Sequence, residues 1–232
     1  MHVWIELPTI TGWLLGVFDG HGGAATAERA SQTVSAAFES SGLASPGSIP
    51  VVLRETVSKL VQAARQDLCG STASLVFIPE DAQDIYWAVL GDSPLAAMDA
   101  ADHLHFGPDH NVRSNLKERA AAESRGGIYR GGYLEDPELP GVGLQMTRSL
   151  GDAKLARVLW REPDIEKVPL GGRGTVLVGS DGLLSPGESS LSNQLSRILN
   201  LTREGAGAQA VVLDALHRKT GDNVTAMVWQ KP

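Results

Sequence analysis

Three short apolar runs in this 232-residue chain border an aspartate that has a glycine beside it. Apolar runs bounded by turn residues are typical of buried β-strands. The three tips are Asp19-Gly20, Asp181-Gly182 and Gly221-Asp222. A glycine at a strand end lets the backbone and a ligand approach closely. One Asp-Gly pair alone is more typical of a tight turn, so the pattern indicates a site only if the three tips meet in space.

The rest of the apolar pattern predicts a chain of mixed α and β structure. Strands are expected at residues 12–18, 71–78, 84–90, 95–99, 175–179 and 223–229. Helical spacing predicts helices at residues 23–40, 51–68, 112–124, 188–199 and 206–219. Because strands and helices do not alternate regularly, an α+β layered domain is favoured over a doubly wound parallel sheet. We expect one domain over residues 1–232, with a long irregular excursion, a candidate flap loop, at residues 126–143.

Composition excludes several classes of protein. The chain has 20 basic and 27 acidic residues, and its net charge of -7 does not attract nucleic acid or an anionic membrane. No run approaches the ~20 apolar residues of a membrane helix, and residues 1–8 lack the basic region of a secretory signal. The one cysteine, Cys69, cannot build a disulfide framework. These features predict a soluble protein of a reducing compartment, the cytoplasm or the nucleus.

The surplus of carboxylates raises the question of a bound cation. Mg²⁺ and Mn²⁺ prefer oxygen ligands, so aspartates at the ends of buried strands are candidate ligands. The alternative of a nucleotide-phosphate loop at residues 16–25 is poor, because no lysine follows Gly23 and the G-x-G-x-x-G pattern is absent.

Nine motifs occur in a fixed order along the chain. They are VFDGHGG, GSTA, GDS, PDHN, ERAAAESRGG, TRSLGD, REPDI, GSDGLL and GDNVTAMV. In this order they resemble the metal-dependent serine/threonine protein phosphatases of the PP2C (PPM) family, and the resemblance covers residues 16–228. It implies a central antiparallel β-sandwich flanked by helices on both sides, in αββα layers, with a metal centre at one end of the sandwich.

The resemblance also implies roles for the residues that match the family motifs. Asp19 is expected to bridge two Mg²⁺ or Mn²⁺ ions, and the carbonyl of Gly20 to bind the second ion. Asp181 and Asp222 match the aspartates that hold the first ion. A water between the ions is the implied nucleophile, since metal coordination brings the pKa of water close to neutral. His21 matches the general acid, and an imidazole suits this role because its pKa lies near the working pH.

Other motif residues have two readings each. Asp109 matches a ligand of a weaker third metal, but an aspartate before a helix is equally expected to cap it. For Arg148 and Asp152, in TRSLGD, a structural ion pair or turn is favoured over a chemical role. The side chains expected to pack and hydrogen-bond beneath the site are Ser71, Thr72 and Ser93.

The chain departs from the family pattern near its start. Family members open with a strand that carries an arginine, which contacts substrate phosphate, and an acidic pair, which orients metal-bound water. Residues 1–12 hold Glu6 as their only acidic residue, and no arginine precedes Arg29. Two explanations stay open, an N-terminally shortened sequence or a protein that works without this strand. Pro8 makes regular strand pairing at this position unfavourable.

A second departure follows the SDG motif. Ser185 stands where the family commonly has an aspartate that binds the third metal, so a third-metal site is in doubt. The segment Ser185-Pro186-Gly187-Glu188 matches a capping box, which predicts that a helix begins there.

Two functions follow from these observations. The leading interpretation is hydrolysis of phosphoserine and phosphothreonine in proteins, with two Mg²⁺ or Mn²⁺ ions as cofactors and phosphorylated proteins as partners. The alternative is a catalytically impaired relative that binds phosphoproteins or regulatory partners, as the missing arginine, the missing acidic pair and Ser185 would allow. In the candidate flap, Tyr129, Arg130 and Tyr133 are expected either to contact substrate or to pack the loop.

Overall fold

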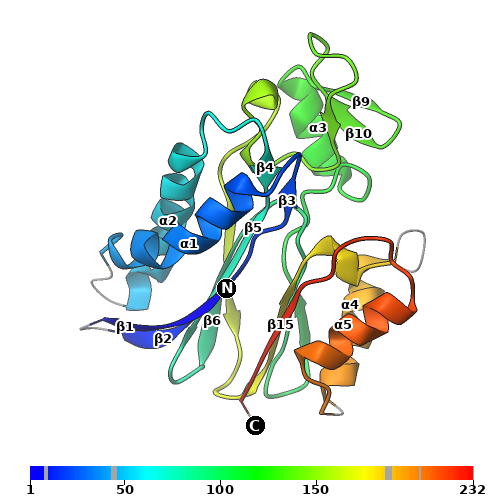
Figure 1. Ribbon diagram of the computed structural model, residues 1–232. Coiled ribbons are helices and arrows are strands. Elements are labelled where there is room, and N and C mark those ends of the chain that lie inside the picture. The colour runs from blue at the N-terminus through cyan, green and yellow to red at the C-terminus, as the bar shows by residue number, and fades with distance from the viewer. Residues whose placement is uncertain (8–9, 43–45, 186–189, 204, 232) are drawn as a thin grey trace.

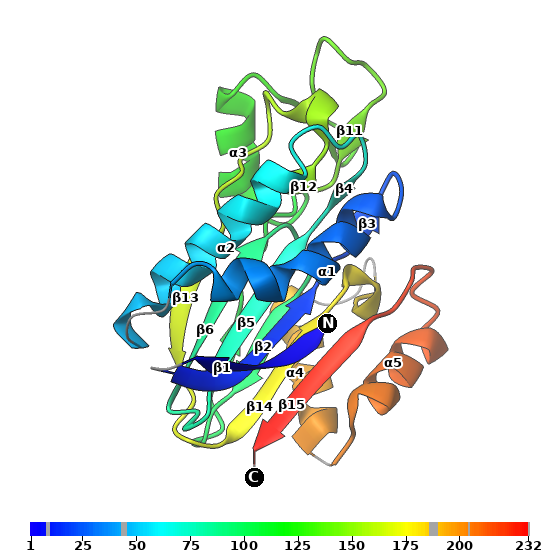
Figure 2. The same cartoon turned by 60° about the vertical axis from the view of Figure 1, so that its left-hand side comes forward.

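The computed structural model describes residues 1–7, 10–42, 46–185, 190–203 and 205–231 (Figure 1). Two antiparallel sheets face each other, and helices cover the outer face of each sheet (Figure 2). This arrangement confirms the predicted α+β sandwich with helices on both sides. No helix in these described ranges is long and apolar enough to cross a bilayer.

The strands form two large and two small sheets. The first large sheet has the order β1 (His2–Leu7), β2 (Ile10–Val17), β5 (Ala73–Pro79), β6 (Asp84–Leu90) and β13 (Asp164–Pro169). The second has the order β15 (Ala226–Lys231), β14 (Gly174–Gly179), β7 (Leu95–Met98) and β8 (Leu104–Phe106). The small sheets are β12 (Leu150–Gly151), β4 (Gly70–Ser71), β3 (Gly20–His21), and β11 (Gly143–Leu144), β10 (Tyr133–Glu135), β9 (Ile128–Arg130).

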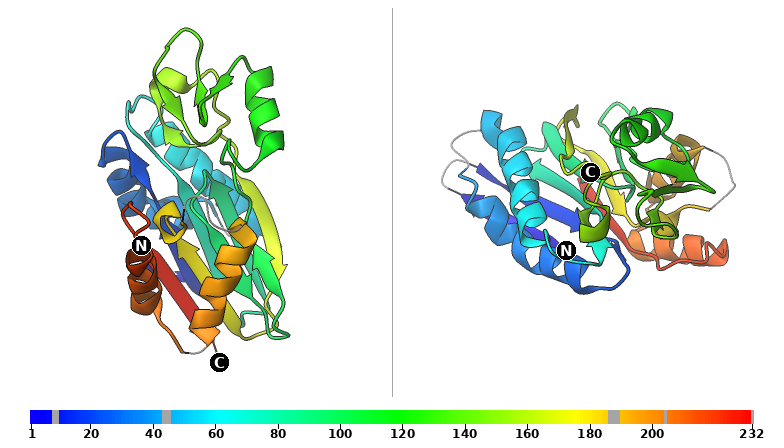
Figure 3. Two further views of the ribbon diagram at one scale, coloured as in Figure 1. Left: turned by 90° about the vertical axis from the view of Figure 1, so that its right-hand side faces the viewer. Right: turned by 90° about the horizontal axis from the view of Figure 1, so that it is seen from above.

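The helices divide between the two outer faces and one end of the sandwich. Helices α1 (Ala25–Glu39) and α2 (Ile49–Ala63) pack on the first large sheet, and α4 (Leu191–Arg203) and α5 (Ala208–His217) pack on the second. Helix α3 (Leu116–Ser124) lies with the sheet of β9, β10 and β11 beyond one end of the sandwich (Figure 3). Short 3₁₀ helices are η1 (Pro46–Ser48), η2 (Ala153–Leu155) and η3 (Asp181–Leu183).

The central strand β5 shows how the sequence builds the layers. Its side chains alternate between faces, as a strand requires. Leu75 and Phe77 pack against α1 and α2, whereas Val76 and Ile78 pack between the two sheets. Phe77 stacks on Phe38 of α1 with 5.1 Å between ring centroids. Both faces of the strand are therefore apolar, which explains its continuous hydrophobic run.

The sheet registers bring several strand ends to the same end of the sandwich. Near the end of β2, Val17 pairs with Ser74 of β5, and the neighbouring Ala73 pairs with Leu90, the last residue of β6. In the other sheet, the last residue of β14 pairs with the first of β15. Strand β6 leads into β7 of the opposite sheet, so the chain crosses between the sheets at this end. The tips that follow β2, β6 and β14 and precede β15 therefore share one end.

The expectation that Pro8 prevents strand pairing near the start is wrong. Strand β1 pairs antiparallel with β2 from His2, opposite Leu15, to Leu7, opposite Ile10. Proline removes a ladder hydrogen bond only at its own position, and Pro8 comes after the last residue of β1. Pro8 itself lies outside the described residues.

The segment expected to be an irregular flap contains regular structure. Residues 126–143 include β9 and β10, which pair as a hairpin, and β11 completes a sheet beside α3. We call α3 with this sheet the flap module. It has its own apolar cluster, which includes Val112, Ala122 and Leu134. The helix expected from residue 112 begins at Leu116, because the Asn115 side chain accepts the first free N–H groups of α3.

The contact between Phe38 and Phe77 yields a stability prediction. Phe38 is fully buried, so Phe38→Ala should lower the free energy of unfolding by about 3–5 kcal/mol through lost burial and the cavity left behind. Val51→Ala, on α2 at a residue that is 56% exposed, is the control and should change little. Urea unfolding of both variants measures the difference, and equal losses would contradict this assignment of the core.

Candidate metal centre

Asp19 is held at the end of β2 by paired hydrogen bonds to the neighbouring strand. The Asp19 N–H donates to the Thr72 hydroxyl at 3.0 Å, and the Thr72 N–H donates to the Asp19 carbonyl at 2.9 Å. Beneath them, the Thr72 and Ser93 hydroxyls are 2.6 Å apart, and the Ser74 hydroxyl donates to the Ser93 carbonyl at 2.7 Å. The Ser71 hydroxyl donates to the Thr72 carbonyl at 2.8 Å. As the sequence analysis predicts, these side chains form a buried polar layer below the site.

The tips that carry Asp181 and Asp222 approach each other closely. The Ser180 N–H donates to the Thr225 carbonyl at 3.1 Å, and the Thr225 N–H donates back to the Ser180 hydroxyl at 3.0 Å. A Cβ atom at Gly182 would lie 2.1 Å from a backbone oxygen of the opposite tip. Only glycine therefore permits this approach, which explains the glycine that follows Asp181.

The three predicted carboxylates influence one another electrostatically. The Asp19 and Asp181 carboxyls lie near enough to shift each other's pKa, and the Asp222 charge acts on both. Burial raises the pKa of Asp19, and the charge of Asp222 adds to the rise. Burial also raises the pKa of Asp181 to about 7, and the charges of Asp92, Asp19 and Asp222 contribute further. The fold thus gathers aspartates from three distant parts of the chain at one place.

Asp92 belongs to this cluster, although the sequence analysis does not single it out. Burial raises the pKa of Asp92 to about 6, a hydrogen bond from Asn111 opposes the rise, and the charges of Asp109 and Asp19 add to it. The Asn111 amide donates to the Asp92 carboxylate at 2.8 Å. A signal was present in the sequence, because Gly91-Asp92 follows the apolar run of β6 and repeats the pattern of the other tips.

The donor set of this cluster fits a hard divalent cation. In the described part of the chain, no lysine or arginine forms an ion pair with any of the four aspartates of the cluster, Asp19, Asp92, Asp181 and Asp222. Clustered carboxylates without a counter-charge are costly unless they bind protons or a cation. All the side-chain donors are carboxylate oxygens, which Mg²⁺ and Mn²⁺ prefer. The cluster therefore suits these two ions.

Asp109 and Gly20, the other two predicted metal ligands, each form contacts with neighbouring residues. The Asp109 carboxylate accepts the Asn111 N–H at 2.9 Å and the Ser114 hydroxyl, so it organises the turn before α3. The cap of α3 itself is Asn115. The charge of Asp109 still raises the pKa of Asp92, so it lies near the cluster. Gly20 pairs with Ser71 across β3 and β4. Metal binding by Asp109 and Gly20 stays a prediction.

His21 makes its strongest side-chain contact with Asp152. The His21 Nε2 atom lies 2.8 Å from a carboxylate oxygen of Asp152, and the Ser149 hydroxyl donates to the same oxygen at 2.6 Å. Burial alone lowers the pKa of His21, but the hydrogen bond and charge of Asp152 outweigh it and raise the pKa overall. Asp152 thus favours the protonated form of His21 and fixes the direction of its ring. Asp152 therefore takes part in an ion pair, one of the two roles expected for it. The partner of Asp152 in this pair is His21, the candidate general acid.

Gly70 permits this His21–Asp152 contact. A Cβ atom at position 70 would lie 2.0 Å from an Asp152 carboxylate oxygen and 2.3 Å from His21 Nε2. The glycine of the GSTA motif is therefore required by the packing of two charged side chains against the β4 backbone.

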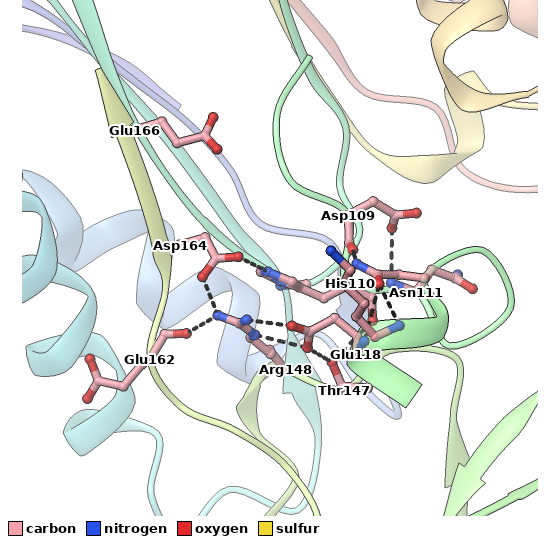
Figure 4. Close-up of polar contacts among 12 residues, drawn as sticks. Asp109, His110, Asn111, Glu118, Thr147, Arg148, Glu162, Asp164 and Glu166 are labelled. Atoms are coloured by element: carbon pink, nitrogen blue, oxygen red, sulfur yellow. Dashed lines mark hydrogen bonds and ion pairs between the residues drawn. The ribbon is translucent and has the colours of Figure 1, made fainter. Parts of the chain in front are cut away.

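A second group of possible ligands lies near the flap module (Figure 4). In the described ranges, His110, Glu118 and Asp164 form the one such group whose potential ligand atoms all lie within 4.8 Å of one another. Among the described residues, no three aspartates of the first cluster have ligand atoms that all lie within 4.8 Å of one another. Ligands divided between two ions about 4 Å apart need not meet that limit. The question is whether the tighter group has room for a cation.

Arg148 already occupies this second group. Its guanidinium lies 2.5 Å from Glu118 and 2.8 Å from Asp164 (Figure 4). The Gly91 N–H donates to His110 Nδ1 at 3.1 Å, so the ring proton is on Nε2, which donates to Asp164 at 3.2 Å. Both carboxylates and both ring nitrogens are thereby used. We conclude that the group is a structural ion-pair network, the role that the sequence analysis favours for Arg148.

The capping-box prediction at Ser185 falls mostly on residues outside the described part of the chain and stays a prediction. Ser185 is buried, its N–H donates to the Gln194 side chain at 2.7 Å, and its hydroxyl accepts a hydrogen bond from Arg218. Helix α4 begins at Leu191, directly after Ser190. Residues 186–188 of the proposed box lie outside the described residues. Position 185 therefore serves the contact between α4 and α5, and a third metal stays doubtful.

Comparison with known proteins decides the family. The family model described as Protein phosphatase 2C matches residues 8–223. The chain belongs to the PP2C family. A rice (Oryza sativa subsp. japonica) relative, Probable protein phosphatase 2C 45, is 28% identical over 220 residues, covering 93% of this chain and 75% of the relative. Probable protein phosphatase 2C 11 of Arabidopsis thaliana is 28% identical over 222 residues, covering 92% of this chain and 57% of the relative.

Solved structures of other proteins share the fold. The serine-threonine phosphatase 2C from Toxoplasma gondii superposes with a TM-score of 0.71 at 18% identity and covers 98% of each chain. A sex determining protein of C. elegans superposes with a TM-score of 0.75 at 22% identity, covering 98% of this chain and 60% of that one. PP2C proteins are generally metal-dependent, and family membership suggests phosphoprotein substrates for this PP2C chain.

The close packing at Gly70 yields a second prediction. Gly70→Ala inserts a methyl group between His21 and Asp152, so the hydrogen bond must break and the pKa of His21 should fall. Titration of the His21 ring signals by NMR measures the change. Gly207→Ala is the control for a glycine replacement, since nothing lies within 4 Å of a Cβ atom there and its φ of -82° suits any residue. An unchanged His21 titration in Gly70→Ala would contradict the assignment.

The Arg148 network yields a pH prediction. The hydrogen bond from His110 is the main cause that lowers the pKa of Asp164 to about 2, with Arg148 contributing and burial opposing. A lowered pKa stabilises the folded state above the ordinary value of about 3.9, and this contribution is lost as the pH falls towards about 2. Asp164→Asn should cost about 1 kcal/mol at neutral pH, a value discounted for the exposure of Asp164.

Urea unfolding between pH 6 and pH 2.5 tests this prediction. The difference in unfolding free energy between the wild type and Asp164→Asn should narrow as the pH falls. Asp81→Asn, at an exposed aspartate outside the network, is the control. A difference that stays constant over this range would show that Asp164 does not titrate as described.

Proposed function

We propose that this PP2C protein hydrolyses phosphoserine and phosphothreonine in proteins with the help of two Mg²⁺ or Mn²⁺ ions. The observation that carries the proposal is the convergence of four aspartate tips at one end of the sandwich without a basic partner. Family membership supports the same activity.

The metal ligands proposed from the sequence keep their assignments. Asp19, the Gly20 carbonyl, Asp181 and Asp222 would hold the two ions, and Asp92 adds a carboxylate to the same cluster. When bound, such ions neutralise the carboxylates, polarise phosphoryl oxygens and activate water as a nucleophile. The hydrogen bonds between the Asp19 backbone and Thr72 hold the backbone at this position without needing the ion.

His21 and Asp152 supply the proton for the leaving group in this proposal. The hydrogen bond and charge of Asp152 raise the pKa of His21, which favours the protonated imidazole that a general acid needs. Its Nε2 faces Asp152, so donation to a departing serine or threonine oxygen needs the proton on Nδ1 or a small movement of the ring. Asp152 orients the ring and stabilises its charge, as the carboxylate of a catalytic dyad does.

The flap module offers candidate substrate contacts. Tyr129 lies under the guanidinium of Arg119, 3.7 Å from its ring centroid, and packs against the core of the flap module. Arg130 is 67% exposed and is 3.7 Å from Glu135. Tyr133 is 40% exposed, with Arg113 over its ring. We therefore assign packing to Tyr129 and substrate contact to Arg130 and Tyr133.

The second candidate function is a phosphoprotein-binding module without turnover. It is favoured by one observation, that Ser185 contacts Arg218 and supplies no carboxylate to the metal cluster. The two candidates differ in a single measurable property, the release of phosphate.

Asp19→Asn tests the proposed hydrolysis. Purified protein with Mn²⁺ should release phosphate from a phosphothreonine peptide, and Asp19→Asn should lower kcat at least about 100-fold, because it removes a charged ligand shared by both ions. Manganese titration by calorimetry should show weaker uptake in the same variant. Asp102→Asn, at an exposed aspartate paired with Arg203, is the control and should retain both properties.

Two results would count against hydrolysis. Full activity in Asp19→Asn would contradict the proposed metal centre. A folded wild type that binds the phosphopeptide and manganese but releases no phosphate would establish the binding module instead.

A further inference from the structure

A pocket outside the metal cluster lies beside the C-terminal half of α2. Its volume is about 280 Å³, and its lining includes Ser58, Gln62, Arg65, Gly151 and Arg161. Helix α2 packs against β12 and β13 here (Figure 2). None of these residues has a place in the proposed hydrolysis, so the pocket needs a separate explanation.

Two arginines line this pocket without a carboxylate partner. Among the described residues, the Arg65 side chain forms no ion pair or hydrogen bond, and it is exposed. The Arg161 guanidinium donates to the Ser149 carbonyl at 2.5 Å and to the Asp152 carbonyl at 3.4 Å. These are neutral backbone acceptors. The charge of Asp152 also acts on Arg161, but the Asp152 carboxylate is paired with His21, so Arg161 forms no ion pair of its own. Two guanidinium groups without an ion-pair partner in one pocket favour an anion.

The remaining groups of the pocket agree with an anionic ligand. Glu162 is the one acidic residue in the described lining, and Arg54 lies 3.3 Å from it, which offsets its charge. The Ser58 hydroxyl and the Gln62 amide can donate hydrogen bonds to an oxyanion. Arg161 is pre-organised, because its bonds to the Ser149–Asp152 segment fix the guanidinium.

The pocket has a defined position relative to His21. His21 pairs with Gly70, and Gly70 pairs with Gly151, which lines the pocket. Two strand spacings separate His21 from Gly151, which is roughly 10 Å. A ligand in the pocket is thus near the proposed reaction centre but separated from it by β4 and β12.

We propose that this pocket binds the dianionic phosphate group of a phosphate monoester. Arginine suits this ligand because its planar guanidinium pairs with two phosphate oxygens at once. The phosphate is carried either by a second phosphorylated side chain of a protein substrate or by a diffusible phosphate ester. Binding itself does not depend on the proposed hydrolysis, whereas the assignment to a substrate rests on it.

Phosphate binding by the 232-residue chain, without divalent metal, tests the proposal. With EDTA present, inorganic phosphate should cause saturable NMR shifts of the Gly151 and Gln62 amides. Arg65→Gln should weaken this binding about tenfold, and Arg65→Lys by less, since it keeps the charge but loses the fork. Arg65 makes no side-chain contact among the described residues, so its replacement should not disturb folding.

Arg173→Gln is the matched control. It removes the same charge from an exposed arginine after β13, at the other end of that strand from the pocket. Its phosphate affinity should equal that of the wild type. Absence of saturable shifts in the wild type, or equal affinities for Arg65→Gln and Arg173→Gln, would overturn the proposal.

Peptides distinguish the two sources of the phosphate. If the pocket holds a second substrate phosphate, a doubly phosphorylated peptide should bind the metal-free protein more tightly than a singly phosphorylated one, and Arg65→Gln should abolish the difference. If the ligand is a diffusible ester, free O-phosphoserine should shift the same amides as strongly as either peptide. Neither readout uses turnover, so failure of the proposed hydrolysis would leave both intact.

Discussion

Carboxylates that lie together at one end of the sandwich repel one another. The surrounding structure must hold them in place against this repulsion. Four aspartates face one another there, and burial together with their mutual charge raises the pKa of Asp181 to about 7 and of Asp92 to about 6. Side chains that repel one another stay together only where the backbone that carries them is held rigidly. The apolar layer between the sheets and the hydroxyl layer of Thr72, Ser74 and Ser93 provide that scaffold. In the proposed function, a divalent cation would relieve the repulsion that the fold creates.

The protein contains two clusters of acidic side chains, and only one of them is neutralised by a basic side chain. At the flap module, Arg148 neutralises Glu118 and Asp164 and links α3 to β13 (Figure 4). His110 extends the same network to the β6–β7 connection through Gly91. This network supplies its own cation, so it holds structure together. The aspartate tips form no ion pair with a lysine or arginine of the described chain, which leaves their charge available for a ligand.

Glycines connect the motifs to this geometry. Gly70 leaves room for the contact between His21 and Asp152, and Gly182 lets the tips of Asp181 and Asp222 approach. In both cases a methyl group would collide with backbone or with a charged side chain. The glycines of GSTA and SDG are therefore required because a larger side chain would collide with residues that are distant in the sequence.

Local pattern was sufficient for much of this protein. Hydrophobic periodicity predicted five helices and strands β2, β5, β6, β7, β14 and β15, but it missed β13 at the edge of the first large sheet. The Asp-Gly tips marked Asp19, Asp181 and Asp222. Both signals depend on neighbouring residues. Pairing across the chain was not readable in this way. The contact of His21 with Asp152 joins residues 131 positions apart, and the inclusion of Asp92 depends on the crossing from β6 to β7. Strand β1, the partner of Arg148 and the role of Ser185 were likewise decided by sheet register and packing, which bring together residues that no local pattern relates.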